Sequence, residues 1–166
     1  METREFKIYF QPIYDIKTSA LCGAEALARK QGLTGEILCP VSFIPTMEAD
    51  GSIAELDLFM FEKTAALIND WRKAGLKTVS VAVNMSQITL QNPALPRLVS
   101  DIINKYNIAP NTIEMEVTET MRCNDFPALQ RTLAAIRASG VKIVMDDFSA
   151  AYSNIIELTL LKADSL

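Results

Sequence analysis

Residues 112–147, TIEMEVTETMRCNDFPALQRTLAAIRASGVKIVMDD, decide the fold that we expect of this chain. Within them, residues 112–120 are rich in β-branched and apolar side chains and predict a strand. Residues 125–140 have helical spacing and end at a glycine, and residues 141–147 predict the next strand. A strand, a helix and a strand in succession indicate a parallel βαβ unit, so the sequence predicts an α/β fold.

The rest of the chain extends this pattern in both directions. Residues 4–16 and 21–30 predict two strands of a hairpin joined by a turn at 17–20, and residues 31–39 are expected to form a loop. The other expected elements are helices at 40–51, 52–75, 93–107 and 153–161 and a strand at 78–86. With no internal repeat and no linker, five strands predict one domain over residues 1–166.

The long helix at 52–75 is predicted from its ends and from one apolar stripe. Ser52 and Glu55 have capping-box spacing, and Gly75 stands where a helix C-terminus favours a left-handed residue. Side chains that recur at helical spacing predict the face that packs on the core. They are Leu56, Phe59, Met60, Lys63, Ala66, Leu67 and Trp71, all apolar except the lysine.

Composition excludes several classes of function. The chain has no histidine, which excludes Ser-His-Asp and Cys-His catalysis and leaves oxygen atoms as the expected ligands of any metal, favouring magnesium, manganese or calcium. A formal net charge of −4 gives no electrostatic reason to expect a nucleic-acid polymer as a partner. Three cysteines without CxxC spacing are expected to be reduced thiols. Since no apolar run is long enough to span a membrane, we expect a cytoplasmic protein.

Polar side chains recur at the ends of the predicted strands. They are Glu25 in the second strand, Asn84 in the third, Glu116 in the fourth, and Asp146 and Asp147 at the end of the fifth. The carboxyl ends of parallel strands form the active face of α/β folds, so we expect these side chains to converge. Carboxylates with one carboxamide would hold a hard cation, which would also neutralise the two adjacent aspartates. Alternatively, Asp146 or Asp147 could simply cap the following helix.

Six motifs resemble one known family in their order and spacing. They are FQPIYD (10–15), AEALAR (24–29), FIP (43–45), VAVNMS (81–86), MEVTET (115–120) and VMDDF (144–148). Together they make nearly the whole chain similar to the EAL domain, the bacterial phosphodiesterase that opens cyclic di-GMP to linear pGpG. The resemblance implies a TIM-like (β/α) barrel whose first strand runs antiparallel to the others.

The resemblance also implies roles for individual residues. Family members bind two Mg²⁺ or Mn²⁺ ions, which activate the attacking water, through residues that align with Glu25, Asn84, Glu116, Asp146 and Asp147. Gln11 aligns with a glutamine that contacts guanine, and Arg29 with an arginine that binds phosphate. Glu119 aligns with a glutamate of the catalytic machinery that steadies the loop after the fifth strand. Without the resemblance, Arg29 would be interpreted as a surface charge.

Two departures from the family pattern bear on activity. The loop after the aspartate pair has Ser149 and Ala151 where the family usually has glycines, and alanine reaches positive φ less readily than glycine. The sequence also stops at Leu166, before the strand that carries the family's lysine and later site residues, and Lys162 does not take that place. We therefore expect a C-terminally incomplete domain with little or no turnover. The alternative is a non-catalytic module that binds cyclic di-GMP or a protein.

An incomplete barrel would also affect association. A complete barrel of this type needs about 200–250 residues, so the predicted strands would form an open sheet with an unpaired edge. We expect self-association through that edge or through the loop after Asp147. Cyclic di-GMP is the expected ligand, and because protein and dinucleotide are both anionic, we expect it to bind through the cations.

Overall fold

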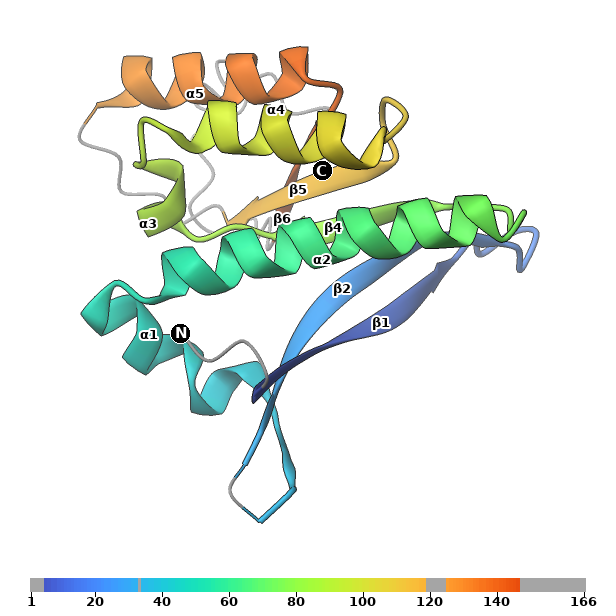
Figure 1. Cartoon of the computed structure of the whole chain (residues 1–166), viewed down its shortest axis with the longest axis horizontal. Helices are drawn as coiled ribbons and strands as arrows, with labels where there is room; N and C mark the ends of the chain where they lie inside the picture. Colours follow the sequence, from blue (N-terminus) through green and yellow to red (C-terminus); the bar gives the residue numbers. More distant parts are fainter. Residues whose placement is uncertain (1–4, 33, 119–124, 147–166) are drawn as a thin grey trace.

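The computed structural model of the chain describes residues 5–32, 34–118 and 125–146. Over these residues it shows one mixed sheet with helices packed against it (Figure 1). The strands are β1 (Phe6–Tyr14), β2 (Leu21–Gln31), β3 (Ile37–Leu38), β4 (Ser80–Asn84), β5 (Ile113–Thr118) and β6 (Lys142–Asp146). The helices are the short 3-10 helix η2 (Pro40–Ser42) and the α-helices α1 (Ile44–Asp50), α2 (Ile53–Lys73), α3 (Gln87–Leu90), α4 (Leu95–Tyr106) and α5 (Phe126–Ala138).

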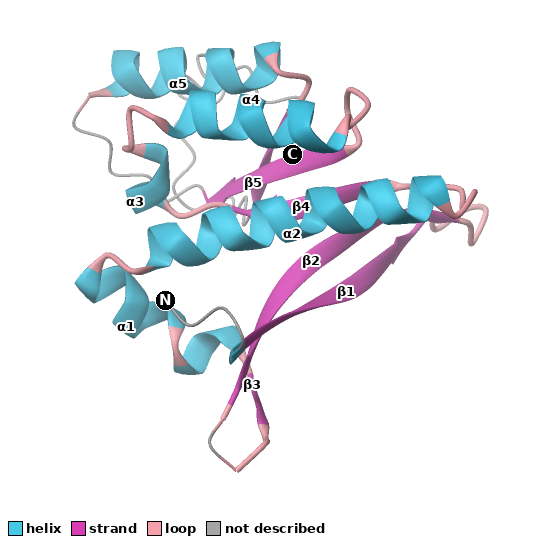
Figure 2. Cartoon of the chain, in the orientation of Figure 1, coloured by secondary structure: helices cyan, strands magenta, loops and turns pink. Residues whose placement is uncertain are grey.

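The sheet has the order β1-β2-β4-β5-β6, with β3 paired to β2 outside this path. Strand β1 is antiparallel to β2, whereas β2, β4, β5 and β6 are parallel to one another. The α/β class and the antiparallel first strand are therefore confirmed. Over the described residues the sheet stays open and does not close into a barrel (Figure 2).

One face of the sheet forms the hydrophobic core. Helices α2, α4 and α5 lie side by side over it (Figure 1). Alternate residues of each strand point to this face, because side chains alternate along a strand. Val81, Val83, Met115 and Ile143 are at most 1% exposed there, and Phe61 of α2 is completely buried against them. Because the helices bury this face, the polar side chains of the strands lie on the opposite face of the sheet.

Three expectations about the elements need correction. Residues 31–39 are not all loop, because Ile37 and Leu38 pair with the end of β2 as β3. Gly35, with a φ of 92°, allows the chain to reverse there. The helix expected at 40–51 is divided into η2 and α1, and the short helix α3 was not predicted. The helix expected at 153–161 lies outside the described residues.

Helix α2 spans the predicted residues, but its cap and its buried face differ from the prediction. Ser52 is the N-cap residue, yet its backbone is helical and its side chain makes no capping hydrogen bond, so the predicted capping box is wrong. Gly75 has a φ of 73°, as expected for the residue after a helix. Buried residues of the helix are Ile53, Leu56, Asp57, Met60, Phe61, Thr64, Ala65 and Ile68, of which only Leu56 and Met60 belong to the predicted stripe. Apolar side chains on several faces of the helix made its periodicity ambiguous.

No helix in the described part of the chain combines the length and the apolar character that crossing a bilayer requires.

Candidate metal and ligand site

The open face of the sheet brings Glu25 and Asn84 into direct contact. Glu25 lies within β2 and Asn84 is the last residue of β4, 59 positions later in the sequence. The Asn84 side-chain amide donates a hydrogen bond of 2.8 Å to Oε1 of Glu25. Two polar residues that the sequence places far apart thus meet where the carboxyl end of β4 lies beside the middle of the adjacent parallel strand β2.

The strand register places two further predicted residues beside this pair. Gln11 is directly opposite Glu25 in the antiparallel β1–β2 pair, and Glu116 is directly opposite Asn84 in the parallel β4–β5 pair. Residues opposite each other on paired strands share a face of the sheet. Gln11, Glu25, Asn84 and Glu116 therefore follow one another across four adjacent strands.

The remaining predicted residues of this site are only partly described. The backbone of Asp146 ends β6 and pairs with that of Thr118, two residues beyond Glu116, so it continues the same line across the sheet. Asp147 and Glu119 lie outside the described residues. Within the residues that the structure describes, no three acidic or thiol side chains gather closely enough to hold a metal ion by themselves. Convergence of the complete set stays a prediction.

The described part of the set fits a hard divalent cation. Asn84 points its amide nitrogen at Glu25, which leaves its carbonyl oxygen as the atom that could bind a cation. Carboxylate and carboxamide oxygens are the ligands that Mg²⁺ and Mn²⁺ prefer. Glu25 and Asn84 both reach solvent in part, so an ion could enter without the fold opening. These residues would therefore supply two ligands of such a site.

Arg29 lies further along β2 than Glu25. Its backbone pairs with that of Lys7, and its guanidinium lies 6.0 Å from the ring centroid of Tyr9. One guanidinium nitrogen donates a 2.9 Å hydrogen bond to the neighbouring carbonyl of Ala28. The four residues from Glu25 to Arg29 correspond to roughly 13 Å of strand, so Arg29 could reach an extended ligand whose other end lies at Glu25.

A cavity of about 410 Å³ opens beside Asn84. It lies between α1, α2 and the carboxyl ends of β2 and β4, and its lining is largely apolar, with Leu27, Ile44 and Met85 among the contributors. Its polar residues are Glu48, Asp57, Asn84, Ser86 and Gln87. A concave, mainly apolar surface with a few polar groups is the usual form of a small-molecule site.

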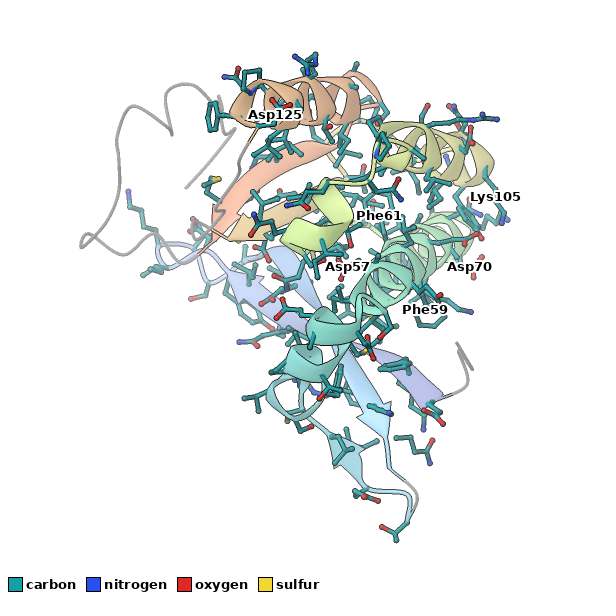
Figure 3. The ribbon with its side chains drawn as sticks, turned by 90° about the vertical axis from the view of Figure 1, so that its left-hand side faces the viewer. Asp57, Phe59, Phe61, Asp70, Lys105 and Asp125 are labelled. Atoms are coloured by element: carbon teal, nitrogen blue, oxygen red, sulfur yellow. The ribbon has the colours of Figure 1, made fainter. Side chains whose placement is uncertain are left out.

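Sequence reasoning missed Asp57, which lies on α2 next to this cavity (Figure 3). Its Oδ2 accepts hydrogen bonds from the backbone N–H of Ser86, at 2.9 Å, and from Oγ1 of Thr89, at 2.6 Å. Burial raises the pKa of the Asp57 carboxyl, against the effect of the hydrogen bonds from Ser86 and Thr89, and the nearby Glu48 raises it further. A charged residue between apolar neighbours at 56 and 58 was the signal that could have identified it.

The family model of the EAL domain matches residues 1–166. The chain belongs to the EAL domain family. An uncharacterised signalling protein of Caulobacter vibrioides is 32% identical over 98% of this chain and 20% of its own length. PdeB of Escherichia coli K12, described as a probable cyclic di-GMP phosphodiesterase, is 30% identical over all of this chain and 32% of its own length. This EAL chain thus spans about a fifth to a third of these curated relatives.

Solved structures of EAL domains have the same fold. The PaMucR phosphodiesterase, in complex with c-di-GMP, superposes with a TM-score of 0.88 at 26% identity, over 98% of this chain and 66% of that chain. The EAL domain of Xanthomonas citri FimX, also in complex with c-diGMP, superposes on this chain with a TM-score of 0.80 at 19% identity. The match covers 96% of this chain and 60% of that chain. The described open sheet of this EAL domain is therefore the arrangement found in TIM-like EAL barrels.

Proposed function

We propose that this EAL domain is a phosphodiesterase module of the type that hydrolyses cyclic di-GMP to linear pGpG. The observation that carries the proposal is the contact between Glu25 and Asn84, in register with Gln11 and Glu116 on the neighbouring strands. Membership of the family and the likeness to PaMucR also support it.

The residues of the predicted site divide into groups with different roles in this proposal. Bound Mg²⁺ or Mn²⁺ would polarise the phosphodiester and lower the pKa of the attacking water. Glu25, Asn84, Glu116, Asp146 and Asp147 would hold the cations, and Glu119 would steady the loop after Asp147. Gln11 donates to or accepts from a guanine edge, because a carboxamide offers both kinds of group. The planar guanidinium of Arg29 would bind a phosphate through two parallel hydrogen bonds.

A binding and hydrolysis experiment tests this function. The chain is titrated with cyclic di-GMP in Mn²⁺, in EDTA and as the Glu25→Ala variant, and pGpG is followed by chromatography. We expect binding that EDTA and Glu25→Ala both weaken at least tenfold, because an anionic protein needs the cations to hold an anionic ligand. Binding that is equally tight in EDTA would contradict the proposed site.

A second candidate function is a non-catalytic module that binds cyclic di-GMP and regulates a partner. The sequence DDFSAAYS (146–153) favours it, because serine and alanine replace the glycines that the family usually has there. Metal-dependent binding without any pGpG would support this candidate, whereas steady formation of pGpG that Glu25→Ala abolishes would support the phosphodiesterase.

The proposal includes self-association, through an edge of the sheet or the loop after Asp147. In the described sheet, β1 and β6 each pair with a neighbour on one side. Unpaired strand edges are templates for pairing with another chain. Sedimentation velocity over a concentration series should show a dimer or larger species, and a monomer at every concentration would contradict this part. The cytoplasmic location stays a prediction.

A further inference from the structure

Asp57 is an unusual residue for the interior of this protein. Its exposed fraction is 7%, and it is the only acidic or basic residue among the buried side chains of the described part of the chain. Burying a carboxylate is costly unless hydrogen bonds satisfy it, so such a residue calls for a specific reason. The reason has to lie in the groups that Asp57 contacts.

Within the described part of the chain, Asp57 makes its hydrogen bonds to one segment, the turn after β4 that leads into α3. Ser86 donates its backbone N–H to Oδ2, and Thr89 donates its hydroxyl to the same oxygen. Since the single hydroxyl proton of Thr89 is used there, the 2.9 Å contact between the Ser86 and Thr89 hydroxyls has Ser86 as its donor. A carboxylate, which only accepts, thus fixes the direction of every hydrogen bond in this small network.

The network begins two residues after Asn84. Met85, between Asn84 and Ser86, donates its backbone N–H to the carbonyl of Glu116 at 2.9 Å. Two successive backbone amides are therefore bound by different elements. The sheet accepts the hydrogen bond of Met85, and Asp57 of α2 accepts that of Ser86. Because both backbone amides are hydrogen-bonded, the backbone after Asn84 has little freedom to rotate. A fixed backbone keeps the Asn84 side chain within reach of Glu25, to which it donates.

We propose that Asp57 is a positioning residue for the candidate metal site, which fixes the turn after β4 and thereby holds Asn84 against Glu25. The identity of the bound cation rests on the proposed function, but the hold on Asn84 does not. Substitution of a residue that orients a metal ligand, without binding the metal itself, typically lowers metal affinity about 10- to 100-fold.

The chain offers a closely matched pair of variants for the test. Thr89 and Thr64 are both fully buried, and each donates its hydroxyl to one acceptor: Thr89 to Asp57, and Thr64 to the carbonyl of Met60 within α2 at 2.8 Å. Thr89→Val and Thr64→Val therefore make the same chemical change at the same degree of burial. Only Thr89→Val removes one of the two hydrogen bonds between the turn and Asp57, and Asp57→Asn is the third variant.

Two measurements on the whole chain decide the proposal. Calorimetric titration with MnCl₂ gives the Kd for the metal alone, and NMR in the absence of metal follows the side-chain amide signals of Asn84. We expect Asp57→Asn and Thr89→Val to weaken Mn²⁺ binding about 10- to 100-fold and to shift the Asn84 signals. We expect Thr64→Val to lower the melting temperature and change neither.

The outcomes separate this proposal from the proposed function. If the unmodified chain binds Mn²⁺, a Kd that Asp57→Asn and Thr89→Val leave unchanged overturns the positioning role. If the unmodified chain binds no Mn²⁺, the proposed metal function fails, and the Asn84 amide signals decide the positioning role. Signals that shift in Asp57→Asn and Thr89→Val but not in Thr64→Val support it, and signals that shift in none of them overturn it.

Discussion

The two faces of the sheet are built from the same strands and differ in what they do. In β4, Val81 and Val83 point into the helix layer and are buried, whereas Asn84, at the end of the strand, is exposed. In β5, Met115 is buried, while the adjacent Glu116 is in register with Asn84. The helix-covered face supplies the stability and the open face carries the candidate chemistry, so substitutions on the two faces should have different consequences.

The largest effect on stability is expected on the covered face, at Phe61. Its side chain is completely buried, whereas Phe59, on the same helix, is only partly buried (Figure 3). Phe61→Ala should lower the free energy of unfolding by about 3–5 kcal/mol, because it leaves a cavity in the packed layer. Phe59→Ala, the matched control, should cost clearly less. Equal losses in chemical denaturation would show that the two sides of α2 contribute alike and would break the comparison.

On the open face we expect the opposite result, a loss of metal binding with little change in stability. Glu25→Gln removes a charged oxygen ligand and should weaken Mn²⁺ binding at least tenfold, while the free energy of unfolding should change by roughly 0.5 kcal/mol or less. Glu114→Gln is the control, since Glu114 lies in the same sheet, on β5, but is ion-paired with Lys142 at 3.4 Å. Its Mn²⁺ affinity should stay that of the unmodified chain. Equal losses in both variants would mean that general negative charge, and not a site, attracts the ion.

A smaller effect should appear in the pH dependence of stability at Asp57, the exception on the covered side. Burial raises its pKa above the usual 3.8, so the folded state holds this proton more tightly than the unfolded state. The resulting contribution to stability is complete below the usual pKa and is lost as the pH rises through the raised value. The side chain of Asp57→Asn does not titrate and cannot lose this contribution, so the stability of this variant relative to the unmodified chain should improve as the pH rises above the usual pKa of 3.8. Urea denaturation at several pH values measures this, and a difference that is constant with pH would contradict the raised pKa.

Local patterns were sufficient to predict most elements of the fold. The alternation of strands with helices, the glycines that end the helices, and the hairpin at the N-terminus all depend on neighbouring residues, and these predictions were confirmed. The exceptions also have local causes. Ser52 has helical dihedrals and cannot cap in the expected way, and β3 is only two residues long and forms by pairing with β2.

For the candidate site, the sequence by itself determined which residues were present and that parallel strands would bring their carboxyl ends to one edge. Only the tertiary structure decided that Gln11 faces Glu25, that Asn84 donates to Glu25, and that Asp57 holds the turn behind them. These contacts join residues 14 to 59 positions apart, and they depend on strand register and on the rotation of α2 about its axis. Neither quantity is fixed by local propensity, because α2 is apolar on more than one side and because register depends on the whole sheet.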